Sequence, residues 1–372
     1  MSLLRHPSSA LLFVALAGLP LVPIHAEDSW WTLSDAAFAQ QYAKQATSPT
    51  IADQSSVAWM LFARANQRVP FNGTTLSQWE VWPSNDDTFS PAVKAFVVQN
   101  KVRTRPHLQA PKDLRFNAHL KLLALPPAGG GEEVTRNGLS YGYIREKGLY
   151  TIGGIKAFFG SPSAQVNFPN GAVEVKASWA SGPVDGAYQV TDTTMTPPAV
   201  YSLLGLHIMA KIAPTPADPF TSENPSWFWT TFEFKGNPGW SHAQTLITYR
   251  DALPPGQAQS LLGQAGLGST AFANYLCNGT QIRFSDDKNP AIVLGNTQME
   301  AGFAIPPGPP ITAWTKWNSS CHSCHATSSG TSAGGMYPFQ NDPIGKLVGI
   351  NPPLTGYRSF DFVWSIDFYA RP

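Results

Sequence analysis

Glycine and proline punctuate the whole sequence and set the strongest limit on its fold. Of the 372 residues, 31 are glycine and 33 are proline, scattered without a fixed period. Such frequent breakers favour many turns and short strands over long helices. Since 43% of the residues are apolar, the chain can also bury a sizeable core. The sequence therefore predicts a mostly β protein of one large or two ordinary domains.

The charge composition of the chain does not indicate a particular binding partner. Charged residues make up only 13% of the sequence, and the formal net charge is +1. This balance provides no basic surface for nucleic acid and no strong field for a charged partner. We therefore expect no nucleic-acid partner, and the sequence leaves the redox partner and the oligomeric state open.

The N-terminus predicts a secretory signal peptide over residues 1–26. Arg5 precedes an apolar stretch at residues 10–22, which leads to the small residue Ala26. This stretch is short for a bilayer span, and no later segment approaches twenty apolar residues. An uncleaved anchor is the alternative. We expect a mature chain that starts near Glu27, has no membrane span and is exported to the periplasm.

The texture of the sequence changes near its middle. Three stretches have helical spacing or composition: residues 34–47, 51–69 and 91–101. Prolines and glycines at residues 125–133 should interrupt regular structure. We therefore expect an α+β protein, with a helical N-terminal region (27–125) followed by a mainly antiparallel β domain (134–372) that carries the C-terminal cofactor site described below.

Short β-branched and aromatic runs dominate the second region. We interpret as strands residues 140–152, 170–180, 198–212, 226–236, 280–286 and 291–300. In the second run Glu174 and Lys176 alternate with Val173, Val175 and Ala177. Because successive residues of a strand point to opposite sides, the charged and the apolar residues should face opposite sides of the sheet.

Two of the three cysteines lie in the sequence CHSCH. C-x-x-C-H is the attachment pattern of c-type haem. Thiols three residues apart can bond to two vinyl groups on one porphyrin edge, and the next imidazole can reach the iron. We predict one covalently attached haem c, held by Cys321 and Cys324, with His325 as the proximal iron ligand. His322, inside the motif, should face solvent.

Other uses of the paired cysteines fit the sequence less well. A structural zinc site usually needs four ligands and a second cysteine pair, whereas only Cys277 is left over. A thioredoxin-like redox pair belongs at the start of a helix in an α/β pattern, and a disulfide is a further alternative. We expect Cys277 to be a buried, inert thiol.

The ligand on the opposite face of the haem is left open. Met336, in a glycine-rich loop, is the only methionine or histidine after the motif. Candidates upstream are His207, Met209, His242 and Met299. His207 and Met209 share strand parity and would face the same side, and we place His207 ahead of the others, with Met336 as the second candidate.

Segments around the motif resemble cytochrome c-prime-beta and its hydroxylamine-oxidising relatives. The resemblance is carried by the C-terminal CHSCH, by FPNGAVEVKASW at residues 168–179 and by DFVWS at residues 361–365. It implies a haem at the end of a β-sheet domain. In the related enzymes a lysine is also linked to the ring, and Lys176 occupies the similar-looking strand.

A wider resemblance is to exported bacterial monohaem c-type cytochromes. It is carried by AWMLFARAN, SQWEVW, VEVKASW, SWFWTTFE, IVLGNTQME, SSCHSCHA and DFVWS. The resemblance implies the haem and the compartment, but no substrate. Where such proteins would have a histidine after TFE, this chain has Phe234, which cannot be a ligand.

Three functions are compatible with these features. Electron transfer needs only a bound haem and a surface on which a partner docks, so we favour it. The alternative is a haem enzyme or small-ligand binder acting on peroxide, nitrogen oxides or hydroxylamine-like compounds. Its acid or base would come from Glu174, Lys176, Glu233 or Glu300, all expected as exposed strand charges. A haem that only staples the C-terminal segment is the third possibility.

Overall fold

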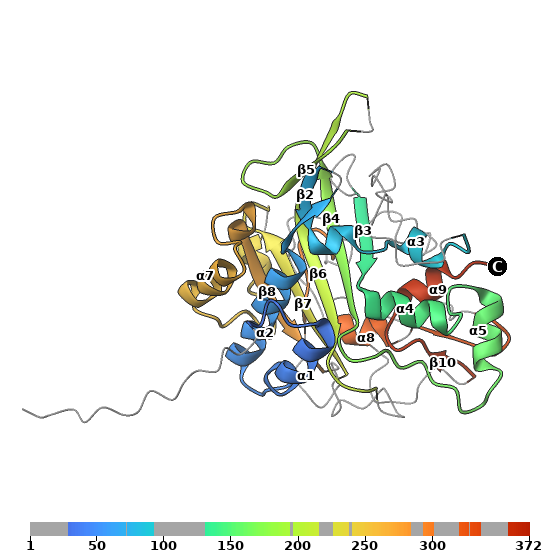
Figure 1. The fold of residues 1–372 in the computed structure, drawn as a ribbon. Coiled ribbons are helices and arrows are strands. Elements are labelled where there is room, and N and C mark those ends of the chain that lie inside the picture. The colour runs from blue at the N-terminus through green and yellow to red at the C-terminus, as the bar shows by residue number, and fades with distance from the viewer. Residues whose placement is uncertain are drawn as a thin grey trace, which may run out of the picture.

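The computed structural model describes ten stretches of the chain, and their arrangement is drawn in Figure 1. They are residues 29–71, 73–92, 131–193, 196–215, 226–237, 240–283, 293–300, 320–326, 328–335 and 356–372. The expected signal peptide, most of the helix expected at 91–101, and Met336 lie outside them. In the described residues no helix has the length and apolar character that a bilayer crossing requires.

An antiparallel sheet forms the centre of the described structure (Figure 1). Its strands follow the order β3 (Gly131–Arg136), β4 (Val173–Ser181), β6 (Ala199–Lys211), β7 (Trp227–Phe234) and β8 (Tyr275–Gln281), with β5 (Gln189–Asp192) also paired to β6. Two small antiparallel pairs are β1 (Arg68–Phe71) with β2 (Thr74–Ser77), and β9 (Ser329–Gly330) with β10 (Arg358–Ser359). The expected combination of helices with a mainly antiparallel sheet is confirmed.

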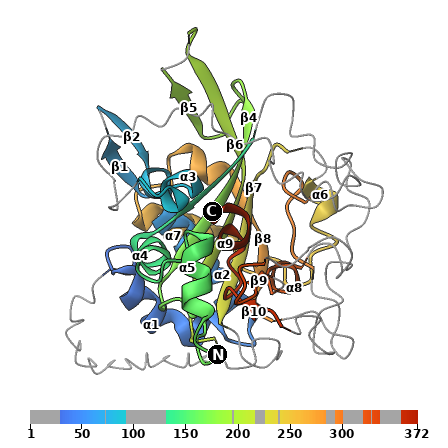
Figure 2. The same ribbon diagram turned by 90° about the vertical axis from the view of Figure 1, so that its right-hand side faces the viewer.

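Helices cover both sides of the sheet. On one side lie α1 (Asp35–Ala46), α2 (Ile51–Ala65) and α7 (Pro255–Gln264). On the other lie α4 (Gly138–Glu146), α5 (Ile152–Phe159), α8 (Cys321–His325) and α9 (Trp364–Tyr369), as Figure 2 shows. Shorter helices are α3 (Asn85–Phe89) and α6 (Trp240–Ala243), with 3-10 turns at Gln78–Val81 and Ala271–Asn274.

The alternation predicted for residues 173–179 is confirmed and divides the sheet into two different faces. The apolar face consists of side chains that point toward α1, α2 and α7: Val173, Val175, Ala177, Leu206, Ile208, Phe228 and Phe232. The mixed face consists of the alternate side chains of the same strands: Glu174, Lys176, His207, Met209, Lys211, Trp227, Trp229, Thr231 and Glu233.

Aromatic packing joins the N-terminal helices to the apolar face. Phe62 of α2 stacks on Phe232 of β7 with ring centroids 4.1 Å apart, and Trp59 meets the same ring edge-on at 5.0 Å. All three rings are buried. Large aromatic side chains contribute most to such cores, so the two predicted and confirmed helices belong to the same packed body as the sheet.

Residues 140–146 belong to α4, and residue 152 begins α5 after a short turn, contrary to the strand that we expected. Asn137 starts α4, because its side-chain oxygen accepts a hydrogen bond from the amide of Ser140 at 3.1 Å. Thr151 starts α5 in the same way, through the amide of Gly154 at 3.0 Å. These caps satisfy the first free amides of each helix, a local signal that outweighs the aromatic composition.

Two other expectations are wrong in detail. Residues 131–133, which we expected within a break in regular structure, begin β3. The described part of the run at 291–300 is a loop instead of a strand. Its polar side chains bond to neighbouring strands, as described below, and the backbone does not join the sheet.

Candidate functional site around the CHSCH helix

The CHSCH sequence forms the short helix α8, which lies against the mixed face near β8 and β9 (Figure 2). The end of β8 holds its first turn, since Gln281 donates to the Ser320 hydroxyl at 2.8 Å. Cys321 is half-buried and packs against the apolar part of this face. Positions 321 and 324 are three apart on one helical turn and so share a side of the helix. The side chain of Cys324 lies outside the described part of the chain.

His325 is oriented by a backbone carbonyl. Its Nδ1 lies 2.8 Å from the carbonyl oxygen of Phe362. A carbonyl only accepts, so Nδ1 carries the proton and the lone pair of the ring is on Nε2. The ring also packs on Trp229, with centroids 4.4 Å apart. This is the tautomer in which an imidazole binds a metal through Nε2.

Burial lowers the pKa of His325 to about 3, while its bond to the Phe362 carbonyl acts in the opposite direction. Electrostatic interactions with Lys176 and His207 lower this pKa further. The imidazole is therefore neutral at pH 7, as a metal ligand must be. Lys176 and His207 are therefore close enough to His325 to act on it electrostatically.

His322 is buried, and our expectation that it faces solvent is wrong. Only 2% of its surface is exposed. Its ring meets Trp229 and Phe362 at centroid distances of 5.9 and 5.4 Å. The contacts with these two rings enclose the side chain of His322. Burial lowers its pKa to about 3, so it is neutral.

Lys176 and His207 are directly opposite each other on β4 and β6. His207 and Met209 share one face, as their spacing predicted. His207 Nε2 lies 2.9 Å from the carboxylate of Glu300, and among the described residues its Nδ1 has no hydrogen-bond partner. Lys176 pairs with Glu132 at 3.0 Å and is half-buried. A short row of polar groups therefore crosses the mixed face beside His325.

The loop at residues 293–300 brings Glu300 to His207. The Asn296 side chain donates to the Thr231 hydroxyl at 3.2 Å and to the Phe232 carbonyl at 3.0 Å, which attaches the loop to β7. The backbone N–H of Asn296 in turn donates to the Glu300 carboxylate at 2.6 Å. Asparagine and threonine in this segment are turn-forming residues, and this signal could have predicted a loop.

Two carboxylates that we expected to be exposed are buried. Glu174 forms an ion pair with Arg136 at 3.1 Å. Glu233 is fully buried and accepts hydrogen bonds from Asn237, Asn278 and the Thr297 amide at 2.9 to 3.0 Å. Burial raises the pKa of Glu233 to about 7, against the effect of these hydrogen bonds.

The remaining candidates for the distal ligand lie on β6, in the loop at residues 293–300 and in α6. Met209 and Met299 are buried, and His242 is in α6 with its side chain outside the described part. Phe234 is buried in the core of the apolar face. Cys277 is a buried free thiol whose pKa is raised by burial, which confirms the expected inert position.

Sequence reasoning did not assign roles to three residues of this site. Trp229 lies in SWFWTTFE, which predicts a strand and is noted for its resemblance, whereas Asp361 and Phe362 lie in DFVWS, noted only for its resemblance. Consecutive positive φ angles at Asp361 and Phe362 leave no clear signal in sequence, because neither residue is glycine.

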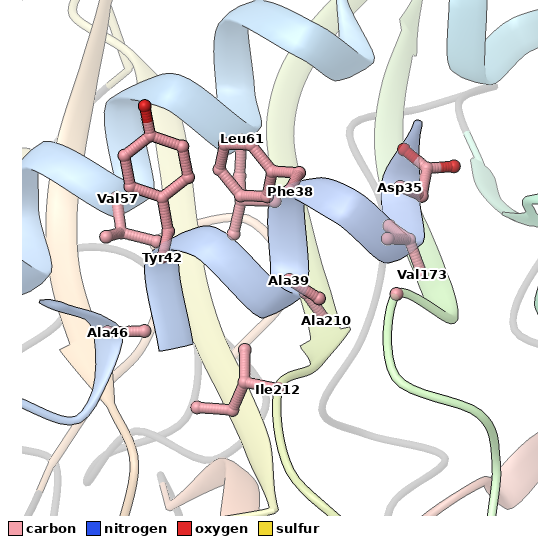
Figure 3. A pocket seen from close by; sticks show the side chains of 11 residues that line it. Asp35, Phe38, Ala39, Tyr42, Ala46, Val57, Leu61, Val173, Ala210 and Ile212 are labelled. Atoms are coloured by element: carbon pink, nitrogen blue, oxygen red, sulfur yellow. The ribbon is translucent and has the colours of Figure 1, made fainter. Parts of the chain in front are cut away.

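An apolar groove on the opposite side of the sheet is too small to compete as a ligand site. It lies between α1, α2 and the strands, and Phe38, Leu61, Ala210 and Ile212 are among its lining residues (Figure 3). Its cavity of about 10 Å³ has room for about one water molecule.

No protein-family model matches the sequence, and comparison with the curated proteins and with the solved structures finds no match. In the described part of the chain, no group of three or more His, Cys, Asp or Glu side chains is arranged to hold a metal ion. The residues around α8 are therefore the basis on which we infer a function.

Proposed function

We propose that this protein is a periplasmic monohaem c-type cytochrome that transfers electrons. Cys321 and Cys324 would carry one haem c through two thioether bonds, and His325 would be the proximal iron ligand. The observation that carries the proposal is the state of His325 within the CHSCH sequence: a neutral ring whose Nδ1 is bonded to a backbone carbonyl and whose Nε2 keeps the lone pair.

The residues present suit such a cofactor. A haem brings four ring nitrogens to its iron, so the chain needs to supply only one or two ligands and no cluster of side chains. Trp229 and the apolar part of the mixed face offer contacts for a flat hydrophobic ring. When bound, the haem supplies a centre that accepts or donates one electron.

A second candidate function is supported by the polar row beside His325. Lys176, His207 and Glu300 are acid or base groups close to one another, and a simple electron carrier does not need them. An open distal face lined by such groups suits a haem enzyme or a binder of small ligands. His207, through Nδ1, is also the distal ligand that we favour for the electron carrier, with Met336 as the other candidate.

The first experiment tests attachment. The protein is produced in a host with cytochrome-maturation machinery, and its intact mass and pyridine haemochrome spectrum are measured. We expect the mass of one haem, which is lost in the Cys321→Ser, Cys324→Ser double variant and kept in the Cys277→Ser control. A parent protein without added porphyrin would refute the proposed function.

The second experiment separates the two candidates. Visible spectra of the reduced protein are recorded with and without carbon monoxide or nitric oxide. A sharp low-spin spectrum that neither gas changes indicates an electron carrier with both axial positions filled. A spectrum that shifts indicates an open site, and His207→Ala should convert the first behaviour into the second if His207 is the distal ligand.

A further inference from the structure

Two consecutive residues next to α8 have an unusual backbone conformation. Asp361 has φ 53° and Phe362 has φ 69°, both in the left-handed region. For residues other than glycine this conformation costs on the order of 1 kcal/mol or more, and bulky side chains adopt it rarely. Such strain persists only where the surroundings hold it in place.

A buried network holds this turn. The Asp361 carboxylate accepts from Lys211 Nζ at 2.7 and 2.8 Å, from the Phe168 amide at 2.7 Å and from Trp227 Nε1 at 3.1 Å. The Thr215 hydroxyl bonds to the same carboxylate. Lys211 and Asp361 are both fully buried. These bonds connect the turn at residues 361–362, directly before α9, to β6, to β7 and to the loop before β4.

The strained turn has a specific result at α8. Phe362 is the second left-handed residue, and its own carbonyl oxygen accepts a hydrogen bond from Nδ1 of His325 at 2.8 Å. The Phe362 side chain, 1% exposed, packs against His322 in the same helix. One two-residue turn therefore contacts both histidines of the CHSCH motif.

A buried ion pair is an expensive way to stabilise a fold. Desolvation of both charges largely cancels their attraction, and apolar residues of similar size often do as well. The Lys211–Asp361 pair therefore calls for a reason other than stability. The position of the turn that it holds, directly at the ring of His325, supplies one.

We propose that Asp361 and Lys211 are positioning residues for the haem-ligating histidine. Through the left-handed turn they aim the Phe362 carbonyl at Nδ1 of His325, which sets the ring orientation and its strength as an iron ligand. This proposal rests on the proposed function. A merely structural role for the pair predicts a loss of stability with no change at the histidine.

The test compares the haem-loaded parent with Asp361→Asn, which keeps the shape of the side chain. In 15N-histidine-labelled reduced protein, with carbon monoxide added where the iron is otherwise paramagnetic, NMR follows solvent exchange of the His325 Nδ1 proton. We expect exchange faster by about tenfold or more, together with a more positive reduction potential, because a weaker hydrogen bond makes the imidazole a poorer donor.

Two further variants keep the result interpretable. Thr215→Val removes the hydrogen bond that the hydroxyl donates to Asp361 and the one that it accepts from Lys211, but it leaves the ion pair, and should shift both readouts in the same direction by less. Asp35→Asn removes a carboxylate from another ion pair, with Arg64 at 2.8 Å on the apolar side, and should change neither.

The outcomes are distinct. Exchange in Asp361→Asn within about twofold of the parent would overturn the proposal, even if the variant is less stable. If Asp361→Asn does not fold, Thr215→Val decides by the same criterion. A parent protein without haem would instead refute the proposed function, and this proposal with it.

Discussion

The two faces of the central sheet use alternate residues of the same strands but are stabilised differently. On the apolar face, Phe62 and Phe232 stack in a core of hydrocarbon and aromatic rings. On the mixed face, Glu174, Lys211 and Glu233 are charged or titratable groups buried together with their hydrogen-bond partners. Burial of apolar surface stabilises the first, whereas the second depends on satisfied hydrogen bonds and ion pairs.

This difference indicates where function is located. Buried charges contribute little net stability, so a sheet that needed only to fold could be apolar on both faces. Among the polar groups of the mixed face, Lys176 and His207 act on the pKa of His325. Lys211 pairs with Asp361, next to the residue whose carbonyl accepts from His325. We infer that the apolar face holds the fold together and that the mixed face holds the chemistry.

The largest expected effect on stability is at the apolar face. Phe232→Ala should lower the free energy of unfolding by about 3–5 kcal/mol, because it leaves a cavity under Phe62 and Trp59. Chemical denaturation followed by circular dichroism measures the change. The visible spectrum of the folded fraction should match that of the parent, and a changed spectrum would show that the two faces are not independent.

The mixed face should respond to loss of a charge partner. Glu174→Leu leaves the Arg136 guanidinium buried beside an apolar side chain, and should cost about 3 kcal/mol of unfolding free energy. The control is the double variant Glu174→Leu, Arg136→Met, which removes both charges. It should recover much of the loss, and a double variant that is less stable than the single one would contradict our account of this face.

Glu233 should make stability depend on pH. Its pKa is about 7 in the folded protein and near 4.5 when unfolded. Between these values the folded state holds a proton that the unfolded state has lost, so the free energy of unfolding should fall as pH rises, by about 3–4 kcal/mol in total.

Denaturation of the parent and of Glu233→Gln at pH 5 and pH 7 measures this contribution. The variant should lack that part of the decrease. The control Glu146→Gln alters a carboxylate with 73% of its side chain exposed and should retain it. Equal pH dependence in parent and Glu233→Gln would be inconsistent with a buried, protonated carboxyl.

The smallest effect on stability is expected at Lys176. Lys176→Ala breaks a partly exposed ion pair with Glu132 and should cost less than about 1 kcal/mol. Its value is spectroscopic. If the parent has a broad, red-shifted Soret band that survives denaturation, a third covalent link is present, and its loss in Lys176→Ala but not in Lys147→Ala would assign the link to Lys176.

Helices and strands that depend on local sequence patterns could be predicted from the sequence. Helices α1 and α2 and strands β4, β6 and β7 follow from spacing and alternation, because each depends on residues within a few positions of one another. The helices α4 and α5 were missed because two capping side chains outweighed a strand-like composition. The shared parity of His207 and Met209 was likewise a local property.

The tertiary contacts around CHSCH could not be predicted from local patterns. The burial of His322 depends on Trp229 and Phe362, which are far from it in sequence. Glu300 reaches His207 through a loop that we expected to be a strand. These contacts join segments whose relative placement no local pattern encodes.

By itself the sequence determined the CHSCH motif and the strand alternation, and it predicts export, since each depends on adjacent or regularly spaced residues. Only the tertiary structure decided that the Phe362 carbonyl meets His325, that Asp361 meets Lys211, and which carboxylates are buried. The physical reason is that hydrogen bonds, burial and pKa depend on which side chains meet in space, and folding brings together partners separated by tens to hundreds of residues.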